Sequence, residues 1–154
     1  MHGSAKHMVY DDVAQYRWAA SVLDADAHVL DFGCGTGRGT DILRAAGHIA
    51  EGYDPHPEIR LVTLGNCYDA VVAFDVLADL TDPPFGTLQA LEKMAPVVLA
   101  SVPFLESPIG ARAHRWFRLQ ESTFPGRQFA YQYADGTIST MPGPAVNLLV
   151  ISMR

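Results

Sequence analysis

A run of alternating glycines constrains the fold of this chain more than any other stretch. Residues 29–43 are VLDFGCGTGRGTDIL, in which a short apolar segment precedes alternating glycines and then a helical pattern. Glycine lets a backbone turn tightly and approach a ligand closely, and the N-terminus of a following helix offers N–H groups to an anion. A purely structural turn is the alternative. However, alternating glycines lower the stability of a fold, so their presence indicates a role beyond the turn itself. The stretch therefore predicts a strand, a loop and a helix that hold a ligand with a carboxylate or phosphate.

The segments on either side predict alternating helices and strands. The expected helices cover 11–23, 38–47 and 83–94, and the expected strands cover 28–32, 48–54, 68–74 and 96–104. Such alternation is typical of an α/β fold in which helices cover both faces of a parallel sheet. We therefore expect a doubly wound, mostly parallel sheet.

The last third of the chain has a different pattern. Residues 106–120 suggest a loop that leads into a short helix. Two strand-like segments, 127–133 and 147–153, flank the turn signal Asp135-Gly136. Two such segments joined through turns pair antiparallel. This part of the chain therefore predicts an antiparallel strand pair at the end of the sheet.

Composition excludes several classes of protein. A chain of 154 residues, 49% of them hydrophobic, has the size of one ordinary domain, and we expect a single domain over 1–154. A net charge of −6 provides no general attraction to nucleic acid or to an anionic membrane. Its two cysteines have neither metal-ligand nor disulfide spacing, and the apolar run 94–105 is too short to span a bilayer. We expect a cytoplasmic protein without a metal site.

The glycine spacing is similar to that of a known enzyme family. Counted from Gly33 it is G-x-G-x-G, since Arg38 stands where the nicotinamide fingerprint has its third glycine. Asp54 follows Gly35 by 19 residues and ends the second expected strand. Together these features resemble motif I and the acidic ribose ligand of class I S-adenosylmethionine-dependent methyltransferases, in particular compact members of the type 11 and 12 kind. The resemblance implies a single Rossmann-like sheet and S-adenosylmethionine as cofactor.

The resemblance divides the chain into an N-terminal helical region (1–27), a cofactor-binding core (28–105) and a substrate-side segment with the terminal strands (106–154). It also assigns roles to individual residues. The implied cofactor-binding residues are Asp31, Gly33, Cys34, Gly35, Gly37, Asp54, Asn66 and Phe74. Asp31 is expected to face the amino group of the cofactor, the glycines to lie under its methionine portion and Asp54 to hold the ribose. Asp54 precedes Pro55 and also suits a simple turn.

The chain departs from the family pattern at the adenine side. Only 13 residues separate Asp54 from Tyr68, where a full family core has a helix and a further strand. Asn66 is the one polar candidate near the position of the adenine ligand. The short connection is compatible with a compact, active enzyme, and also with a degenerate module that binds cofactor without catalysis.

The catalytic candidates are Asp75 and His114. Asp75 follows the strand 68–74, beside the expected methionine end, although it also suits a helix cap or a solvent-facing position. Residues 76–80 are VLADL, where many small-molecule methyltransferases have V-L-E-H-L, so no base carries over there. His114 lies in the segment 111–118, which combines three arginines with two aromatic residues. This segment suits an anionic or planar acceptor, or else a solvated helix packed on the sheet.

The tetrapeptide Asp82-Pro83-Pro84-Phe85 resembles a second motif. In amino-methyltransferases of nucleic-acid bases, such residues hold the target amine and stack on a flipped base. Here it begins seven residues after Asp75, beyond hydrogen-bond reach of the strand tip unless the chain doubles back. It also suits a helix start, with Asp82 as N-cap and Pro83 first in the helix. A small-molecule acceptor is therefore favoured, and a nucleic-acid acceptor is the alternative.

Overall fold

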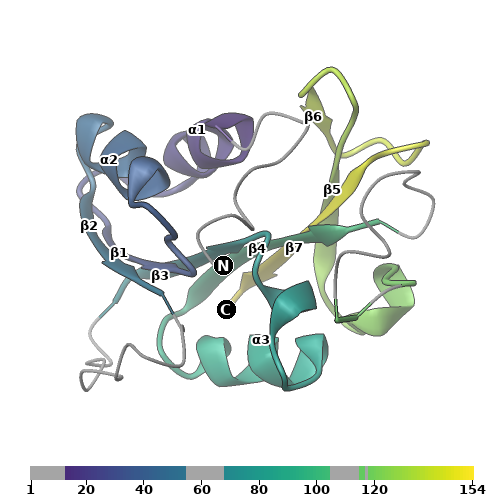
Figure 1. The fold of residues 1–154 in the computed structure, drawn as a ribbon. Helices are drawn as coiled ribbons and strands as arrows, with labels where there is room; N and C mark the ends of the chain where they lie inside the picture. The colour runs from purple at the N-terminus through teal and green to yellow at the C-terminus, as the bar shows by residue number, and fades with distance from the viewer. Residues whose placement is uncertain (1–12, 55–67, 105–114, 117) are drawn as a thin grey trace.

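A seven-stranded sheet forms the centre of the molecule (Figure 1). The computed structural model describes residues 13–54, 68–104, 115, 116 and 118–154. In chain order its elements are α1 (Val13–Val22), β1 (His28–Phe32), α2 (Arg38–Ala45), β2 (Ile49–Tyr53), β3 (Ala70–Phe74), the 3₁₀ turn η2 (Leu77–Asp79), α3 (Pro84–Glu92), β4 (Val97–Pro103), the 3₁₀ turn η3 (Glu121–Thr123), β5 (Gln128–Gln132), β6 (Ile138–Ser139) and β7 (Asn147–Met153). The predicted fold class is confirmed.

The strand order places a topological switch between β1 and β3. Strands run in the order β2-β1-β3-β4-β7-β5-β6, and the pairs β2–β1, β1–β3 and β3–β4 are parallel. After β1 the chain therefore passes to one side of the sheet, and with β3 it returns to the other side of β1. In open α/β sheets, ligands bind beyond the carboxyl ends of the strands at such a switch.

Helices cover both faces of the parallel strands. Helices α1 and α2 lie on one face and α3 lies on the other (Figure 1). All five residues of β3 are buried, because Val72 and Phe74 pack into the α1–α2 side whereas Val71 and Ala73 pack into the α3 side. A strand covered on both faces is apolar throughout, which explains why AVVAF lacks the alternation of a surface strand. None of the described helices has the length and apolar character needed to cross a bilayer.

The antiparallel part of the sheet is built around β7. This strand pairs antiparallel with β4 on one side and with β5 on the other, which confirms the predicted antiparallel pair. The structure adds the short strand β6, which the sequence pattern does not indicate. The chain reaches it through a turn in which Gly136 has a φ of 91° and Asp135 accepts a hydrogen bond from the Thr137 N–H.

The start of α3 differs from the prediction by one residue. Pro83, not Asp82, is the N-cap, and Pro84 is the first helical residue. Proline suits this position because its fixed φ matches the helix and its missing N–H has no intrahelical partner there. Asp82 is exposed, so its predicted role as cap is wrong.

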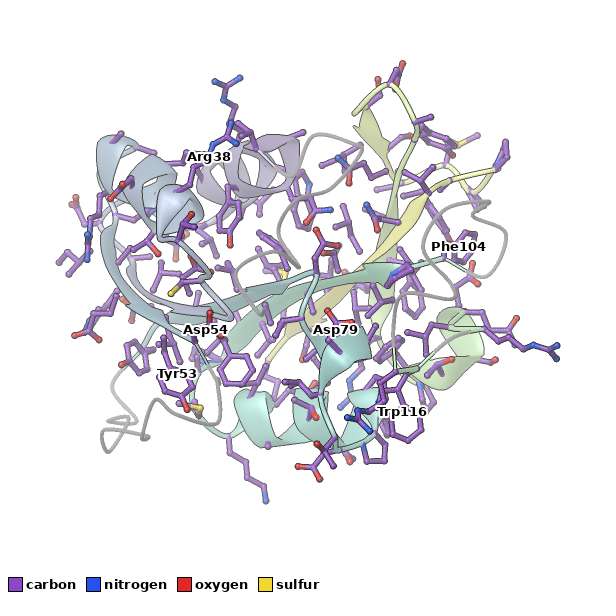
Figure 2. The ribbon with its side chains drawn as sticks, viewed as in Figure 1. Arg38, Tyr53, Asp54, Asp79, Phe104 and Trp116 are labelled. Carbon is purple, nitrogen blue, oxygen red and sulfur yellow. The ribbon has the colours of Figure 1, made fainter. Side chains whose placement is uncertain are left out.

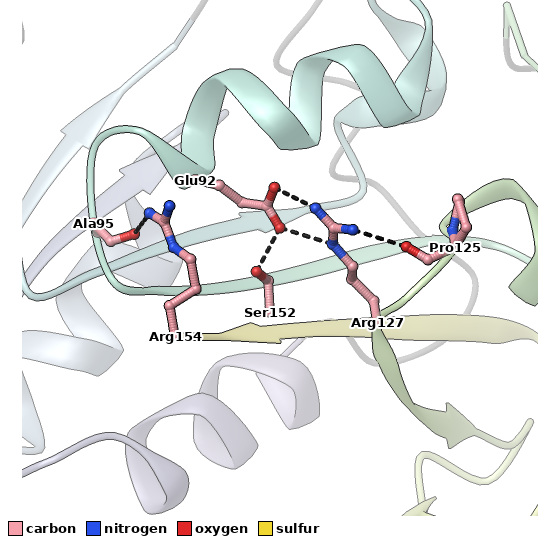
Figure 3. A network of polar contacts seen from close by, with 6 residues as sticks. All are labelled: Glu92, Ala95, Pro125, Arg127, Ser152 and Arg154. Atoms are coloured by element: carbon pink, nitrogen blue, oxygen red, sulfur yellow. Dashed lines mark hydrogen bonds and ion pairs between the residues drawn. The ribbon is translucent and has the colours of Figure 1, made fainter.

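A polar network fastens α3 to the antiparallel strands (Figure 3). The guanidinium of Arg127 donates to both carboxylate oxygens of Glu92, at 2.9 and 2.6 Å, and the hydroxyl of Ser152 in β7 donates to the same carboxylate. Arg127 lowers the pKa of Glu92 from its ordinary value through these hydrogen bonds, against the raising effect of burial. Glu92 is therefore held ionised, and it connects α3 to β7 and to Arg127, the residue directly before β5.

Candidate active site

The glycine loop after β1 is tied to the end of β2. The N–H groups of Gly33 and Cys34 both donate to the Tyr53 carbonyl, at 2.6 and 3.1 Å. Gly37 is the N-cap of α2 in the left-handed conformation, with a φ of 91°, and no atom of the described residues lies within 4 Å of where its Cβ would stand. The loop therefore leaves open space in front of the α2 N-terminus.

The same loop touches the chain segment that follows β3. A Cβ added to Gly33, whose φ is 80°, would come within 2.7 Å of the Val76 Cβ. Only glycine fits here, because a side chain at position 33 would collide with the Val76 side chain at its Cβ, which cannot rotate away. The loops after β1 and β3 therefore meet at the switch point.

Asp31 lies below the loop in the interior. It is fully buried, and its carboxylate accepts hydrogen bonds from the Tyr16 hydroxyl at 2.9 Å and from the Thr40 hydroxyl at 2.8 Å. The Tyr16 ring occupies the space that a side chain at Gly39 would fill. Asp31 thus connects α1 and α2 beneath the glycine loop, and its predicted contact with the cofactor amino group stays a prediction.

Asp54 follows β2, the strand next to β1, and is half-buried. Beside it, the Tyr53 ring packs against Phe32 at 5.7 Å between centroids. Burial raises the pKa of the Tyr53 hydroxyl, and the neighbouring Asp54 raises it further. Figure 2 shows Asp54 and Tyr53 together at the end of β2. The role of Asp54 as the ribose ligand stays a prediction.

Asp75 begins the segment after β3 in a strained conformation. Its φ is 56°, a left-handed geometry that costs a residue other than glycine roughly 1 kcal/mol. Its N–H donates to the Ser101 hydroxyl at 2.9 Å. Asp75 is 3% exposed, so the solvent-facing alternative is wrong.

Phe74, the last residue of β3, points into the core. Its ring is fully buried and packs edge-to-face on Tyr16, with centroids 5.0 Å apart and planes at 84°. The side chain therefore supports α1, and only the backbone of Phe74 lies at the strand end.

A chain of buried polar side chains adjoins Asp75, and the sequence pattern does not reveal it. The Ser101 hydroxyl donates to the Gln15 carbonyl oxygen at 2.8 Å, and the Gln15 amide donates to Gln132 at 2.7 Å. Asn147 donates to the same Gln132 oxygen at 2.9 Å. A polar residue on an otherwise apolar helix face, such as Gln15 between Val13 and Tyr16, is the one local sign of it.

Two predicted site residues, Asn66 and His114, lie outside the described residues. Of the segment 111–118, the structure describes Arg115, Trp116 and Arg118. The Trp116 indole N–H donates to the Leu80 carbonyl at 2.8 Å, and its backbone N–H donates to the Ala78 carbonyl at 2.9 Å. Trp116 therefore packs against the turn after β3, close to Asp79 (Figure 2). Over the described part of the chain, no group of His, Cys, Asp and Glu side chains is arranged to hold a metal ion.

Comparison with known proteins decides the family. A family model described as a methyltransferase domain matches residues 7–135. The chain belongs to the methyltransferase domain family. A search of curated protein sequences returned no match.

Solved structures share the fold of this methyltransferase. A TehB-like SAM-dependent methyltransferase from Corynebacterium glutamicum has 16% identity and a TM-score of 0.65, over 98% of this chain and 91% of that one. The complex of the Haloferax volcanii Trm112 methyltransferase activator with the putative methyltransferase matches with 16% identity and a TM-score of 0.68, over 99% and 93%. The N-terminal domain of EvdMO1, solved with SAH bound, matches with 13% identity and a TM-score of 0.53, over 94% and 81%.

The class predicted from the glycine spacing is thereby confirmed. The protein is a class I S-adenosylmethionine-dependent methyltransferase, and S-adenosylmethionine is its cofactor. The residues present fit that group, because the methyltransferase leaves the space at Gly37 open where a side chain would fill it. The carboxylate of Asp54 stands one strand away.

Proposed function

We propose that this methyltransferase transfers the methyl group of S-adenosylmethionine to a small-molecule acceptor that binds where the loops after β1 and β3 meet. The contact that Gly33 makes with Val76 carries the proposal, because it brings the cofactor loop directly against the Asp75 segment. The sulfonium of S-adenosylmethionine supplies an activated methyl group. The protein has to hold the acceptor in line with it in a water-poor cleft.

The cofactor side of the site consists of the glycine loop and Asp54. The open space at Gly37 and the α2 N-terminus suit the carboxylate of the methionine portion. Asp54 suits the ribose hydroxyls, since a carboxylate accepts two hydrogen bonds at once. Asp31 supports the loop from below through its bonds to Tyr16 and Thr40.

The acceptor side consists of Asp75, with His114 as a further candidate. The carboxylate of Asp75 suits an acceptor that presents an N–H or O–H group, either as a hydrogen-bond acceptor or as a base. A base is needed only for an acceptor that loses its proton before or during the attack. For an acceptor that does not, orientation is the main contribution of the protein.

Packing of the Asp82-Pro83-Pro84-Phe85 stretch supports a small molecule over a nucleic-acid base. The Phe85 ring packs against Phe124, with centroids 6.5 Å apart, and the Arg127 guanidinium lies 5.1 Å from its centroid. A ring engaged in this way does not stack on a flipped base. Asp82 is exposed at the start of α3.

Isothermal titration with S-adenosylmethionine and S-adenosylhomocysteine tests the cofactor site. We expect the wild type to bind both ligands, and Asp54→Ala to weaken binding at least about tenfold through lost ribose hydrogen bonds, or about 1.4 kcal/mol. The exposed Asp82→Ala is the matched control and is expected to bind as the wild type. Absence of wild-type binding at millimolar ligand excludes the proposed function, and full binding by Asp54→Ala excludes the ribose assignment.

Transfer of radiolabelled methyl to a cell lysate, fractionated into metabolites, protein and nucleic acid, tests the acceptor class. We expect the label in the metabolite fraction, with Asp82→Ala and Phe85→Ala as active as the wild type. Label in nucleic acid that disappears in Phe85→Ala supports the base-methylating alternative instead. Cofactor binding without label in any fraction identifies a non-catalytic module.

A further inference from the structure

Two consecutive residues of α1 connect to the two halves of the active site. Tyr16 donates to Asp31 beneath the glycine loop, at 2.9 Å. Gln15 accepts from Ser101, at 2.8 Å, and Ser101 in turn contacts Asp75. The side chains of both α1 residues are almost fully buried. Helix α1 therefore supports the cofactor side through one residue and the acceptor side through the next.

The distances around Ser101 show which groups donate and which accept in this network. A serine hydroxyl has a single proton, and that of Ser101 lies 2.8 Å from Gln15 Oε1 but 3.4 Å from Asp75 Oδ1. The proton therefore goes to Gln15, and a lone pair of the hydroxyl accepts the Asp75 N–H at 2.9 Å. The same N–H also lies 3.3 Å from the Ser101 carbonyl oxygen, so the Ser101 hydroxyl adds a shorter, second hydrogen bond that holds the backbone of Asp75.

The far end of the network fixes the orientation of Gln15. Gln132 Oε1 accepts from the Gln15 amide at 2.7 Å and from the Asn147 amide at 2.9 Å. Because its nitrogen is engaged there, Gln15 presents its carbonyl oxygen to Ser101. Strands β4, β5 and β7 and helix α1 thus all contribute to holding one backbone N–H.

Such a network is an unusual use of a protein core. Gln15, Ser101, Gln132 and Asn147 are each 0% exposed. Buried polar groups are costly unless satisfied, and apolar side chains of similar size fill a core more simply. What this network provides is a defined position for the residue at its end, Asp75, whose left-handed φ of 56° needs support from its surroundings.

We propose that Ser101 and Gln15 are positioning residues for methyl transfer, which hold Asp75 so that its carboxylate receives the N–H or O–H of the acceptor. The acceptor is accordingly an amine or a hydroxyl compound. This inference rests on the proposed function and deepens it. Ser101 and Gln15 act through Asp75, and their removal leaves the cofactor side in place.

The test combines kinetics with cofactor binding. Initial rates are measured with radiolabelled S-adenosylmethionine at saturation and the metabolite fraction of a lysate in a dilution series. We expect Ser101→Ala to lower the maximal rate at least about tenfold, as expected when an acid–base group is displaced. Ser101→Thr, which keeps the hydroxyl, restores most of the rate, and S-adenosylhomocysteine affinity stays within about twofold of the wild type in both.

A double-mutant cycle separates positioning from general support of the fold. Ser101→Ala in an Asp75→Asn background is expected to cause no further loss of rate, because Ser101 acts on the reaction only through the Asp75 carboxylate, which Asp75→Asn already removes. Gln15→Met, which keeps the size of the side chain, repeats the cycle from α1 and covers the case in which Ser101→Ala does not fold. Wild-type activity in both Ser101→Ala and Gln15→Met overturns the inference, as do losses that multiply in the cycle or an equal loss of S-adenosylhomocysteine affinity.

The identity of the product completes the test. Methyl recovered on an amine nitrogen or a hydroxyl oxygen supports the inference. Methyl on a thioether sulfur or on a ring nitrogen without hydrogen overturns it, although the proposed methyltransferase function stands. A wild type that binds S-adenosylhomocysteine and labels no metabolite overturns both.

Discussion

Gly37 and Gly136 have the same positive φ in different parts of the molecule. Both have a φ of 91°, and among the described residues neither has an atom within 4 Å of an added Cβ. An alanine at either site therefore brings the same left-handed strain, about 1 kcal/mol, and no clash. Gly37 precedes the N-terminus of α2, whereas Gly136 lies in the turn between β5 and β6. The pair separates the cost of strain from the cost of a filled cofactor site.

We expect Gly37→Ala and Gly136→Ala to lower the free energy of unfolding by similar amounts, about 1 kcal/mol each. Only Gly37→Ala is expected to weaken S-adenosylhomocysteine binding, by about tenfold or more, because its methyl group enters the space for the methionine portion. Urea denaturation and isothermal titration measure the two effects. Equal affinity in both variants contradicts the assignment of Gly37 to the cofactor site.

At this scale the sequence reveals the loop better than the acceptor side. The glycines and Asp54 carry a local signal, since spacing and strand position suffice to find them. Ser101 and Gln15 carry none, because they are 86 residues apart and meet only after the sheet has formed. Phe74 is an intermediate case. Its position at the end of a strand is predictable from the sequence, but its packing on Tyr16 depends on where α1 lies.

At the scale of elements, α3 depends on the ion pair between Glu92 and Arg127. The Glu92 side chain is 8% exposed and the Arg127 side chain 22% exposed, so water screens this pair little. Removing one partner of a buried ion pair leaves the other charge uncompensated, which typically lowers the free energy of unfolding by about 3 kcal/mol or more. The pair therefore makes a measurable contribution to stability, in contrast to an exposed ion pair.

The contribution of Glu92 is expected to depend on pH. Arg127 lowers the pKa of Glu92 below its ordinary value of 4.5, so the stabilisation is present above that pH and is lost as the pH falls through the folded-state pKa. Arg127→Met is therefore expected to lower the free energy of unfolding by about 3 kcal/mol at pH 7. The difference in free energy of unfolding between the wild type and this variant is expected to become smaller below about pH 4. Urea denaturation from pH 7 to pH 3 measures it.

The exposed pair of Asp41 and Arg44, 3.7 Å apart, provides the control. Arg44→Met is expected to cost less than about 1 kcal/mol at any pH in that range. If the loss of unfolding free energy caused by Arg127→Met stays constant down to pH 3, the ionised state of Glu92 is contradicted.

Most element boundaries follow from local signals, and the exceptions have physical causes. β1 spans the residues predicted for it, because the apolar run ends at a glycine. The start of α3 is displaced because the second of two prolines, not the first, is the first helical residue. β6 has two residues and is a strand only through its pairing with β5, so its own sequence contains no strand pattern.

The whole molecule is expected to be stabilised by its cofactor. A ligand that binds only the folded state at about 100 times its Kd adds about 2.7 kcal/mol. For a chain of 154 residues this corresponds to a rise in Tm of about 5 to 10 °C. Thermal melts with and without S-adenosylhomocysteine measure the shift, and adenosine without the methionine portion is the control with a smaller expected effect. A Tm that does not respond to S-adenosylhomocysteine contradicts the cofactor site.

The place of β7 has a consequence for how the chain folds during synthesis. β7 (Asn147–Met153) comes after all the other strands in the sequence, yet it lies between β4 and β5 in the sheet. Until the ribosome has made this strand, β4 has no neighbour on that side, and β5 and β6 are not joined to the parallel strands. Pairing over such sequence separations is slow, and unpaired strand edges promote aggregation. The nascent chain therefore passes through a period in which the parallel strands β2, β1, β3 and β4 can already pair, while joining of β5 and β6 to the sheet waits for β7 to leave the ribosome.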